Sequence, residues 1–302
     1  MRLILLVPLA LAAAVPLAGL VMLERAPAFD AGRAFEHIRQ LVAIGPRPPG
    51  SSGSRQAREY IIAELKRSGI TATEQRFDAV TPFGPMQMTN VLARIPGQRP
   101  ERLLIGGHYD TKLYRQFRFV GANDGGSSTA MLLELGRVLA QRKSPLTIEL
   151  AFFDGEEALL PNWGEGDNTY GSRHYVAAAQ KDGSLGTVKG LVLVDMVGDR
   201  QLNILREGHS TRWMMDLIWA SAARLGHRAA FLDEGFAVDD DHRPFLVAGV
   251  PAVNVIDLDY AAWHTPNDTL DQVSARSLQF VGDVVLDALP KIQARLLSPQ
   301  TH

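Results

Sequence analysis

Four short apolar segments, each followed at once by polar residues, constrain the fold of this chain more than any other feature. Largely apolar runs of this length are typical of strands buried on both faces, as in parallel sheets covered by helices. Two further strands are expected over residues 71–80 and 88–95, and an edge strand over 202–205. The four apolar strands are predicted at 102–106, 146–153, 190–194 and 251–256.

Helical patterns alternate with these strands. We therefore predict a single α/β domain built on an open mixed, mostly parallel sheet, with helices on both faces. Ligands of such folds bind at the carboxyl ends of the strands. The helices are predicted at 31–43, 55–68, 127–141, 172–181, 211–225, 243–248 and 274–297.

The composition limits the chemistry available to the chain. Of its 302 residues, 46% are hydrophobic and 21% charged, which is typical of a globular domain. A net charge of −2 without a basic block gives no indication of a nucleic-acid partner. The chain has no cysteine, which excludes disulfides, a Cys nucleophile and thiolate metal ligands. Any metal would have to be held by His and carboxylate side chains.

The N-terminus indicates export. Residues 3–23 are uncharged and mostly apolar, which is about the length that spans a bilayer and longer than the usual ~7–15-residue core of a signal peptide. Pro8 and Pro16 weaken a straight helix there. We predict that residues 1–25 are a signal peptide or an uncleaved membrane anchor, and that residues 26–302 are a catalytic domain outside the cytoplasm, periplasmic or extracellular.

Side chains that can bind a metal follow the predicted strands. Each of these residues, taken alone, is more often structural than functional, and a Glu-Glu pair is usually a solvated turn. Because they are expected at one edge of one sheet, together they predict a zinc site without thiolates. These residues are His108, Asp124, Glu156, Glu157, Asp195 and His264.

The Glu156-Glu157 pair suggests two roles. Adjacent side chains at a strand end point in different directions, so one carboxylate could bind the metal while the other transfers protons. Other chemistries have weaker support. The loop 121–126 lacks the Lys-Ser/Thr of a phosphate-binding loop, no Gly-x-Ser-x-Gly motif occurs, and residues 171–174 are predicted as a helix cap. Residues 240–242 fit either a second metal site or a surface helix cap.

Seven motifs, in combination, resemble the zinc-dependent glutaminyl cyclases. Those enzymes share the M28 superfamily with the two-zinc aminopeptidases, and the match runs from about Ala31 to the C-terminus. The motifs lie at residues 108–112, 121–124, 152–158, 170–174, 195–198, 240–246 and 263–265.

The resemblance implies an activity: the conversion of the N-terminal Gln of peptides and proteins to pyroglutamate, with release of ammonia. It also implies a role for each matching residue. Glu156 is the implied proton shuttle, Asp195 the residue that hydrogen-bonds the reacting amide, and Asp240 part of the supporting network. The implied ligands of one zinc ion are Asp124, Glu157 and His264, and the implied pocket walls are Trp163 and Trp263.

A two-zinc aminopeptidase that hydrolyses N-terminal residues is the alternative. In that branch His108 and Asp195 would hold a second zinc, with Asp124 bridging. The cyclase is favoured by three segments: the loop that carries Trp163, the Asp154-Gly155 dipeptide directly before the Glu pair, and residues 240–245. A non-enzymatic zinc-binding domain is disfavoured, because it has no need of Glu156.

The chain departs from the animal cyclases at three positions. Gly107 and Thr129 stand where those relatives carry a disulfide pair, so that cross-link is absent. Asn254 stands where they place a His, which puts the hydrogen-bond network behind Asp195 in question.

Overall fold

The computed structural model describes residues 27–298. The predicted signal peptide or anchor lies outside these residues. Within residues 27–298, every helix is either too short or too polar to span a membrane.

A six-stranded sheet forms the centre of the molecule, in the order β1-β2-β4-β3-β5-β8. Strand β2 is antiparallel to both of its neighbours, whereas β4, β3, β5 and β8 run parallel. The prediction of a mixed, mostly parallel sheet is confirmed. The strands are β1 (Ala72–Thr81), β2 (Gly84–Ile95), β3 (Arg99–His108), β4 (Leu146–Phe153), β5 (Val188–Asp195) and β8 (Ala252–Ile256).

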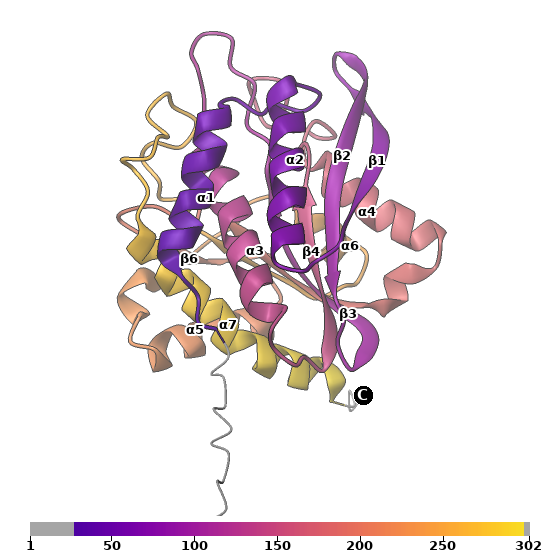
Figure 1. Cartoon of the computed structure of the whole chain (residues 1–302), viewed down its shortest axis with the longest axis vertical. Helices are drawn as coiled ribbons and strands as arrows, with labels where there is room; N and C mark the ends of the chain where they lie inside the picture. The colour runs from indigo at the N-terminus through magenta and orange to yellow at the C-terminus, as the bar shows by residue number, and fades with distance from the viewer. Residues whose placement is uncertain (1–26, 299–302) are drawn as a thin grey trace, which may run out of the picture.

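Helices cover both faces of the sheet, because its central strands are apolar on both sides. In β3, Leu103 and Ile105 join the larger core, while Leu104 between them joins the core on the opposite face. In Figure 1, α1, α2 and α3 lie side by side in front of the sheet. The larger core includes α1 (Ala31–Ile44), α2 (Ser52–Arg67), α3 (Gly126–Leu139), α5 (Arg212–Arg224) and α7 (Ala275–Leu297), and the smaller includes α4 (Tyr170–Lys181) and α6 (Arg243–Val247).

The predicted edge strand at 202–205 was wrong in its placement. Strand β6 (Ile204–Glu207) lies outside the main sheet and pairs in parallel with β7 (Phe231–Phe236) in a two-stranded sheet. Strand β7 was not predicted. Its sequence FLDEGF is largely exposed and has no apolar alternation, so no periodic pattern marks it.

Helix α3 connects two ends of the molecule. Its first turn begins directly after Asp124, at the carboxyl edge of the sheet. Near its other end, Arg137 donates to the Ala28 carbonyl (2.9 Å) and Arg142 to the Pro27 carbonyl (2.8 Å). The first described residues are therefore fixed at the end of α3 that lies away from Asp124.

Candidate active site

Three predicted metal ligands meet at the carboxyl edge of the sheet. His264 Nε2 lies 3.1 Å from Glu157 Oε1 and 3.4 Å from Asp124 Oδ2. Glu157 follows β4, Asp124 precedes α3, and His264 belongs to the loop after β8. Because β4 and β8 run parallel, their following loops reach the same edge. The structure therefore brings together three residues that are far apart in the sequence.

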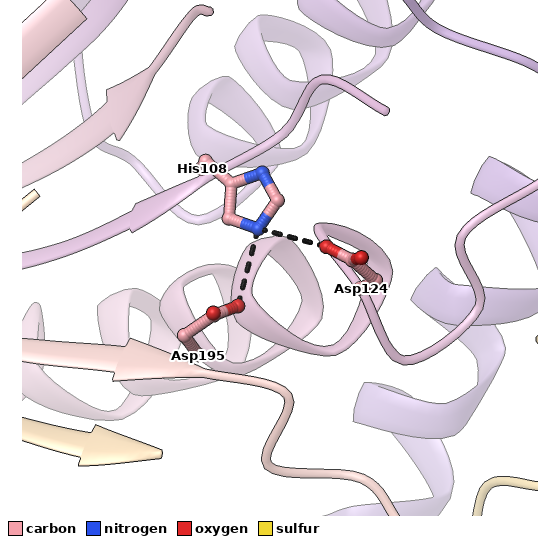
Figure 2. A group of neighbouring side chains, drawn as sticks. All are labelled: His108, Asp124 and Asp195. Atoms are coloured by element: carbon pink, nitrogen blue, oxygen red, sulfur yellow. Dashed lines mark hydrogen bonds and ion pairs between the residues drawn. The ribbon is translucent and has the colours of Figure 1, made fainter. Parts of the chain in front are cut away.

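A second group lies beside the first and shares Asp124 with it. His108 Nε2 is 3.1 Å from Asp195 Oδ1 and 3.3 Å from Asp124 Oδ1. Figure 2 shows the imidazole of His108, at the end of β3, directed between these two carboxylates. Asp124 thus presents one oxygen to His108 and the other to His264.

The electrostatics of these groups fit a bound cation. Burial, reinforced by the charge of Glu157, raises the pKa of Asp124 to about 6, and burial raises the pKa of Glu157 to about 7. Asp124 Oδ2 and Glu157 Oε2 are buried without a hydrogen-bond partner among the described residues. Ionised carboxylates in such a setting need a compensating charge, and a set of His and carboxylate ligands suits zinc. The residues therefore fit a zinc ion.

His264 reaches this group through an unusual backbone conformation. Its φ is 56°, in the left-handed region, and Met196, directly after Asp195, has a φ of 46°. For non-glycine residues such a conformation costs about 1–3 kcal/mol, and it persists where the surrounding structure enforces it. Both residues line the same pocket, which makes this edge of the sheet a candidate functional site.

That pocket, of about 440 Å³, contains most of the predicted site. Trp163 and Trp263 are 40% and 42% exposed, so both contribute to a mouth open to solvent. The Trp263 ring stacks on the His264 imidazole with centroids 4.3 Å apart. The predicted site residues that line the pocket are Asp124, Glu156, Glu157, Trp163, Asp195, Asp240, Trp263 and His264.

The Glu156 carboxylate lines this pocket and is not held by a hydrogen bond within the described part of the chain. It is only 6% exposed, and no hydrogen bond to its carboxylate occurs among residues 27–298. Burial raises the pKa of Glu156 well above its ordinary value, and the nearby Asp240 carboxylate adds to the increase. A buried carboxylate with a raised pKa beside a metal-binding group is suited to accept and return a proton near neutral pH.

Two buried carboxylates that were given no role by the sequence support the site. Asp110 accepts hydrogen bonds from the backbone N–H groups of Glu156 (3.2 Å) and Glu157 (3.4 Å). Asp268 accepts from the backbone N–H of Asp124 (3.1 Å). Each lies within four residues of a predicted site histidine, and this proximity is the signal that could have identified them.

Lys112 was also not predicted as a site residue. Its side chain is buried, and its Nζ donates to the Ala158 carbonyl (2.9 Å) and lies 3.7 Å from Glu157 Oε2. A buried ammonium so close to Glu157 offsets part of the negative charge gathered at this edge.

The loop that carries Trp163 is built around Asp167. The Asp167 carboxylate accepts from the Leu160 backbone N–H (2.8 Å) and the Tyr170 hydroxyl (2.7 Å), and the Asp167 N–H donates to the Gly164 carbonyl (3.1 Å). These bonds close the loop on both sides of the tryptophan. They set the position of Trp163 at the mouth of the pocket.

Both interpretations of residues 240–242 were wrong. All three side chains are buried, which contradicts a surface cap, and none belongs to a group of potential metal ligands within the described part of the chain. They form a polar network instead. Asp240 accepts from Asn254 Nδ2 (2.7 Å), Asp241 from the Ser172 hydroxyl (2.5 Å), and His242 Nε2 lies 3.0 Å from Glu207 Oε2.

Residues 171–174 are not a helix cap either. Helix α4 begins at Tyr170 after the N-cap residue Thr169, so Ser172 lies inside the first turn, where its hydroxyl is free to reach Asp241. His174 stacks on Phe77 with centroids 4.2 Å apart. Ser172 and His174 therefore do not form a catalytic pair.

Gly107 and Thr129, which stand where the animal cyclases carry a disulfide pair, are closely packed. The Thr129 hydroxyl donates to the His108 carbonyl (3.2 Å), which ties α3 to the end of β3. A Cβ atom at Gly107 would lie 2.9 Å from both Ser128 Cβ and the Val194 carbonyl oxygen, so a side chain there would displace its neighbours.

Comparisons with known proteins agree with this arrangement. The model of peptidase family M28 matches residues 90–289. The glutaminyl-peptide cyclotransferase-like protein of Mus musculus is 33% identical over 77% of this chain and 68% of its own length. A glutaminyl cyclase crystal structure from an Acidobacteriales bacterium has a TM-score of 0.85 and 38% identity, covering 95% of this chain and all of that one.

A peptidase structure is also similar. A leucine aminopeptidase precursor from Bacteroides thetaiotaomicron has a TM-score of 0.81 and 25% identity, covering 88% of this chain and 98% of that one. The length of the match to the family model and the identity to the mouse relative show the relationship: this chain belongs to peptidase family M28, and within it to the glutaminyl-peptide cyclotransferases.

Proposed function

We propose that this chain is a zinc-dependent glutaminyl-peptide cyclotransferase, which converts an N-terminal Gln of peptides and proteins to pyroglutamate and releases ammonia. The observation that carries the proposal is Glu156, a buried carboxylate with a raised pKa that faces the pocket beside the Asp124, Glu157 and His264 group. The named relatives of the chain support this activity over peptide hydrolysis.

One zinc ion would be held by Asp124, Glu157 and His264, all of which line the pocket. When bound there, it would supply Lewis-acid polarisation of the γ-carboxamide oxygen of the substrate. Lys112 and Asp268 would keep Glu157 and Asp124 in place through the contacts described above.

The group around His108 is better explained as an internal ion pair than as a second metal site. Burial alone would lower the pKa of His108, but Asp195 and its other carboxylate neighbours raise it well above its ordinary value. A protonated His108 offsets one of the two negative charges of Asp195 and Asp124 at contact distance, which lowers the need for a second cation. His108 also does not line the pocket, whereas His264 does.

Ring closure requires one proton transfer in each direction. The α-amine attacks the γ-carboxamide carbon, Glu156 takes the proton that the nitrogen loses, and Glu156 returns it to the nitrogen that leaves as ammonia. Asp195 accepts a hydrogen bond from the reacting amide, and Asp240 supports this arrangement from the pocket wall. Because nucleophile and electrophile belong to one substrate, binding serves mainly to hold the chain in a ring-closing conformation.

Trp163 and Trp263 would flank the glutamine side chain. Their rings offer flat apolar walls to its methylene groups, while the carboxamide lies toward the polar end of the pocket. The stacking of Trp263 on His264 links this wall to the metal-binding group.

Product analysis tests the proposal. Purified chain is incubated with a Gln-initiated peptide and, separately, with a chromogenic aminoacyl amide, while ammonia, pyroglutamate and free amine are measured. We expect ammonia and pyroglutamate in equal amounts from the first substrate. Free amine from the second substrate without pyroglutamate from the first would refute the cyclase.

A two-zinc aminopeptidase is the second candidate, because the His108, Asp124 and Asp195 group has ligand types and spacing that could accept a metal. Metal analysis separates the two functions. We expect one tightly bound zinc per chain, and two would favour the peptidase.

We further propose that the protein is exported and acts in the periplasm or outside the cell, either as a cleaved form or anchored by residues 3–23. The apolar run in the sequence supports this. The intact mass of protein extracted from membranes distinguishes cleavage from anchoring, and recovery of uncleaved protein from the cytosol would contradict export.

A further inference from the structure

A second cavity adjoins the active-site pocket. It has a volume of about 800 Å³ and lies between the Trp163 loop, α4 and α6. It shares Trp163, Asp239 and Asp240 with the active-site pocket, so the two cavities adjoin at the tryptophan. The groove between α1 and α2, of similar size, shares no lining residue with that pocket.

The lining of this cavity, the α4–α6 groove, is mixed, with an apolar wall beside polar residues such as Asn168 and Gln180. Val247, at the end of α6, is 82% exposed there. Val176 and Ala177 from α4 and Pro244 and Ala248 from the α6 region complete an apolar wall.

The two arginines at the groove already have partners. Arg243 Nε donates to Asp239 Oδ1 (2.9 Å), and Arg173 donates to the Asn168 carbonyl (Nη2, 2.6 Å) and the Gly166 carbonyl (Nη2, 2.9 Å). Arg173 also lies over the Tyr170 ring, 4.9 Å from its centroid. Because Glu165, Asp239 and Asp240 also line the groove, the two guanidinium charges are offset and the groove offers little attraction to an anionic side chain.

We propose that the α4–α6 groove binds the residues that follow the N-terminal Gln, and that it selects peptides with apolar side chains at these positions. The proposal rests on the proposed cyclase function. A substrate that places its first residue in the pocket must continue past the mouth, and the adjoining groove lies on that side of Trp163. An extended peptide advances about 3.3 Å per residue, and a cavity of this size falls within the ~300–1,000 Å³ that is typical of small-ligand sites, enough for one or two side chains.

Three substrates and two variants test the groove. The substrates are Gln-Gly, Gln-Gly-Gly-Gly-Gly and Gln-Gly-Leu-Leu-Gly, each assayed for kcat/KM by ammonia release. Val247→Asp places a charge on the apolar wall. Val80→Asp is the matched control, because Val80 is 86% exposed on β1 and lines none of the pockets described above.

Wild-type protein should process the Leu peptide about tenfold better than the Gly peptide, which is the effect of partly burying one or two leucine side chains. Val247→Asp should remove most of that preference, while Gln-Gly turnover stays within about twofold. Val80→Asp should behave as the wild type.

Equal kcat/KM for the Leu and Gly peptides in the wild-type protein would overturn the groove proposal. So would an equal loss on all three substrates in Val247→Asp, since it would show damage to the pocket rather than to a subsite. Failure of the wild-type protein to form pyroglutamate from any substrate is a separate result, because it refutes the cyclase function itself.

Discussion

Asn254→Ala is the substitution that most directly probes the network behind the pocket. Asn254 lies in the middle of β8, fully buried, and its Nδ2 donates to Asp240 Oδ2 at 2.7 Å. Its backbone N–H donates to the Ser210 hydroxyl (3.0 Å), which in turn donates to Glu207. The Ala variant keeps the backbone bond and removes only the side-chain donor to Asp240.

The size of the effect follows from that single bond. A buried hydrogen bond to a charged group is worth about 1.5–3 kcal/mol. If Asp240 needs this donor to keep its place in the pocket, kcat should fall about 10- to 100-fold. The effect on stability should be smaller, because Asn254 Oδ1 is buried without a partner among the described residues and its removal relieves that cost.

Steady-state ammonia release, zinc content and thermal unfolding, measured together on each variant, check this reasoning. We expect the Ala variant to keep its zinc and a cooperative unfolding transition, with the loss in kcat rather than in KM. Asn254→His, which restores a ring N–H donor, should recover part of the activity. An Ala variant with wild-type kcat would refute a positioning role for Asn254.

Three further predictions concern the same site. Glu156→Gln should lower kcat at least about 100-fold with zinc retained, whereas Glu157→Ala should lose the metal; an active Glu156→Gln enzyme would contradict the proton-transfer role. The pKa values of Glu157 (about 7) and Asp124 (about 6) are raised, so their ionised forms destabilise the metal-free fold. Metal-free protein should therefore gain thermal stability as the pH falls through this range, while zinc binding weakens. A calorimetric series in which stability falls as the pH falls would disprove this reasoning. Asp167→Asn should raise KM through a displaced Trp163, with zinc content unchanged, and an unaltered KM would show that the loop does not depend on this carboxylate.

The main sheet could be predicted because its central strands are apolar on both faces. The segment 146–153 coincides with β4, since all its residues except Thr147 and Glu149 are apolar and it is bounded by a Pro and by the Asp154-Gly155 turn. The site followed from the sheet. Once the strands are parallel, the polar residues after each one must gather at one edge, and this placed Glu157 near His264.

Segments whose own sequence has no distinctive periodicity or motif could not be placed in this way. The stretch 240–242 fits a second metal site or a surface helix cap by its sequence, and only Asn254, Ser172 and Glu207 from distant elements show why its side chains are buried. Strand β7 was missed for the same reason, because its pairing with β6 depends on tertiary contacts rather than on its own pattern.

The attachment of residues 27 and 28 near the far end of α3 determines how a tethered form of this protein would face its surroundings. Asp124 precedes the first turn of α3, and Arg137 and Arg142 hold Ala28 and Pro27 near its last turn. A helix of 14 residues is about 20 Å long, so Pro27 and Ala28 lie at the end of α3 away from the edge of the sheet that carries the pocket. A membrane-held enzyme would therefore open toward the surrounding fluid, where the free N-termini of passing polypeptides could enter without approaching the lipid surface.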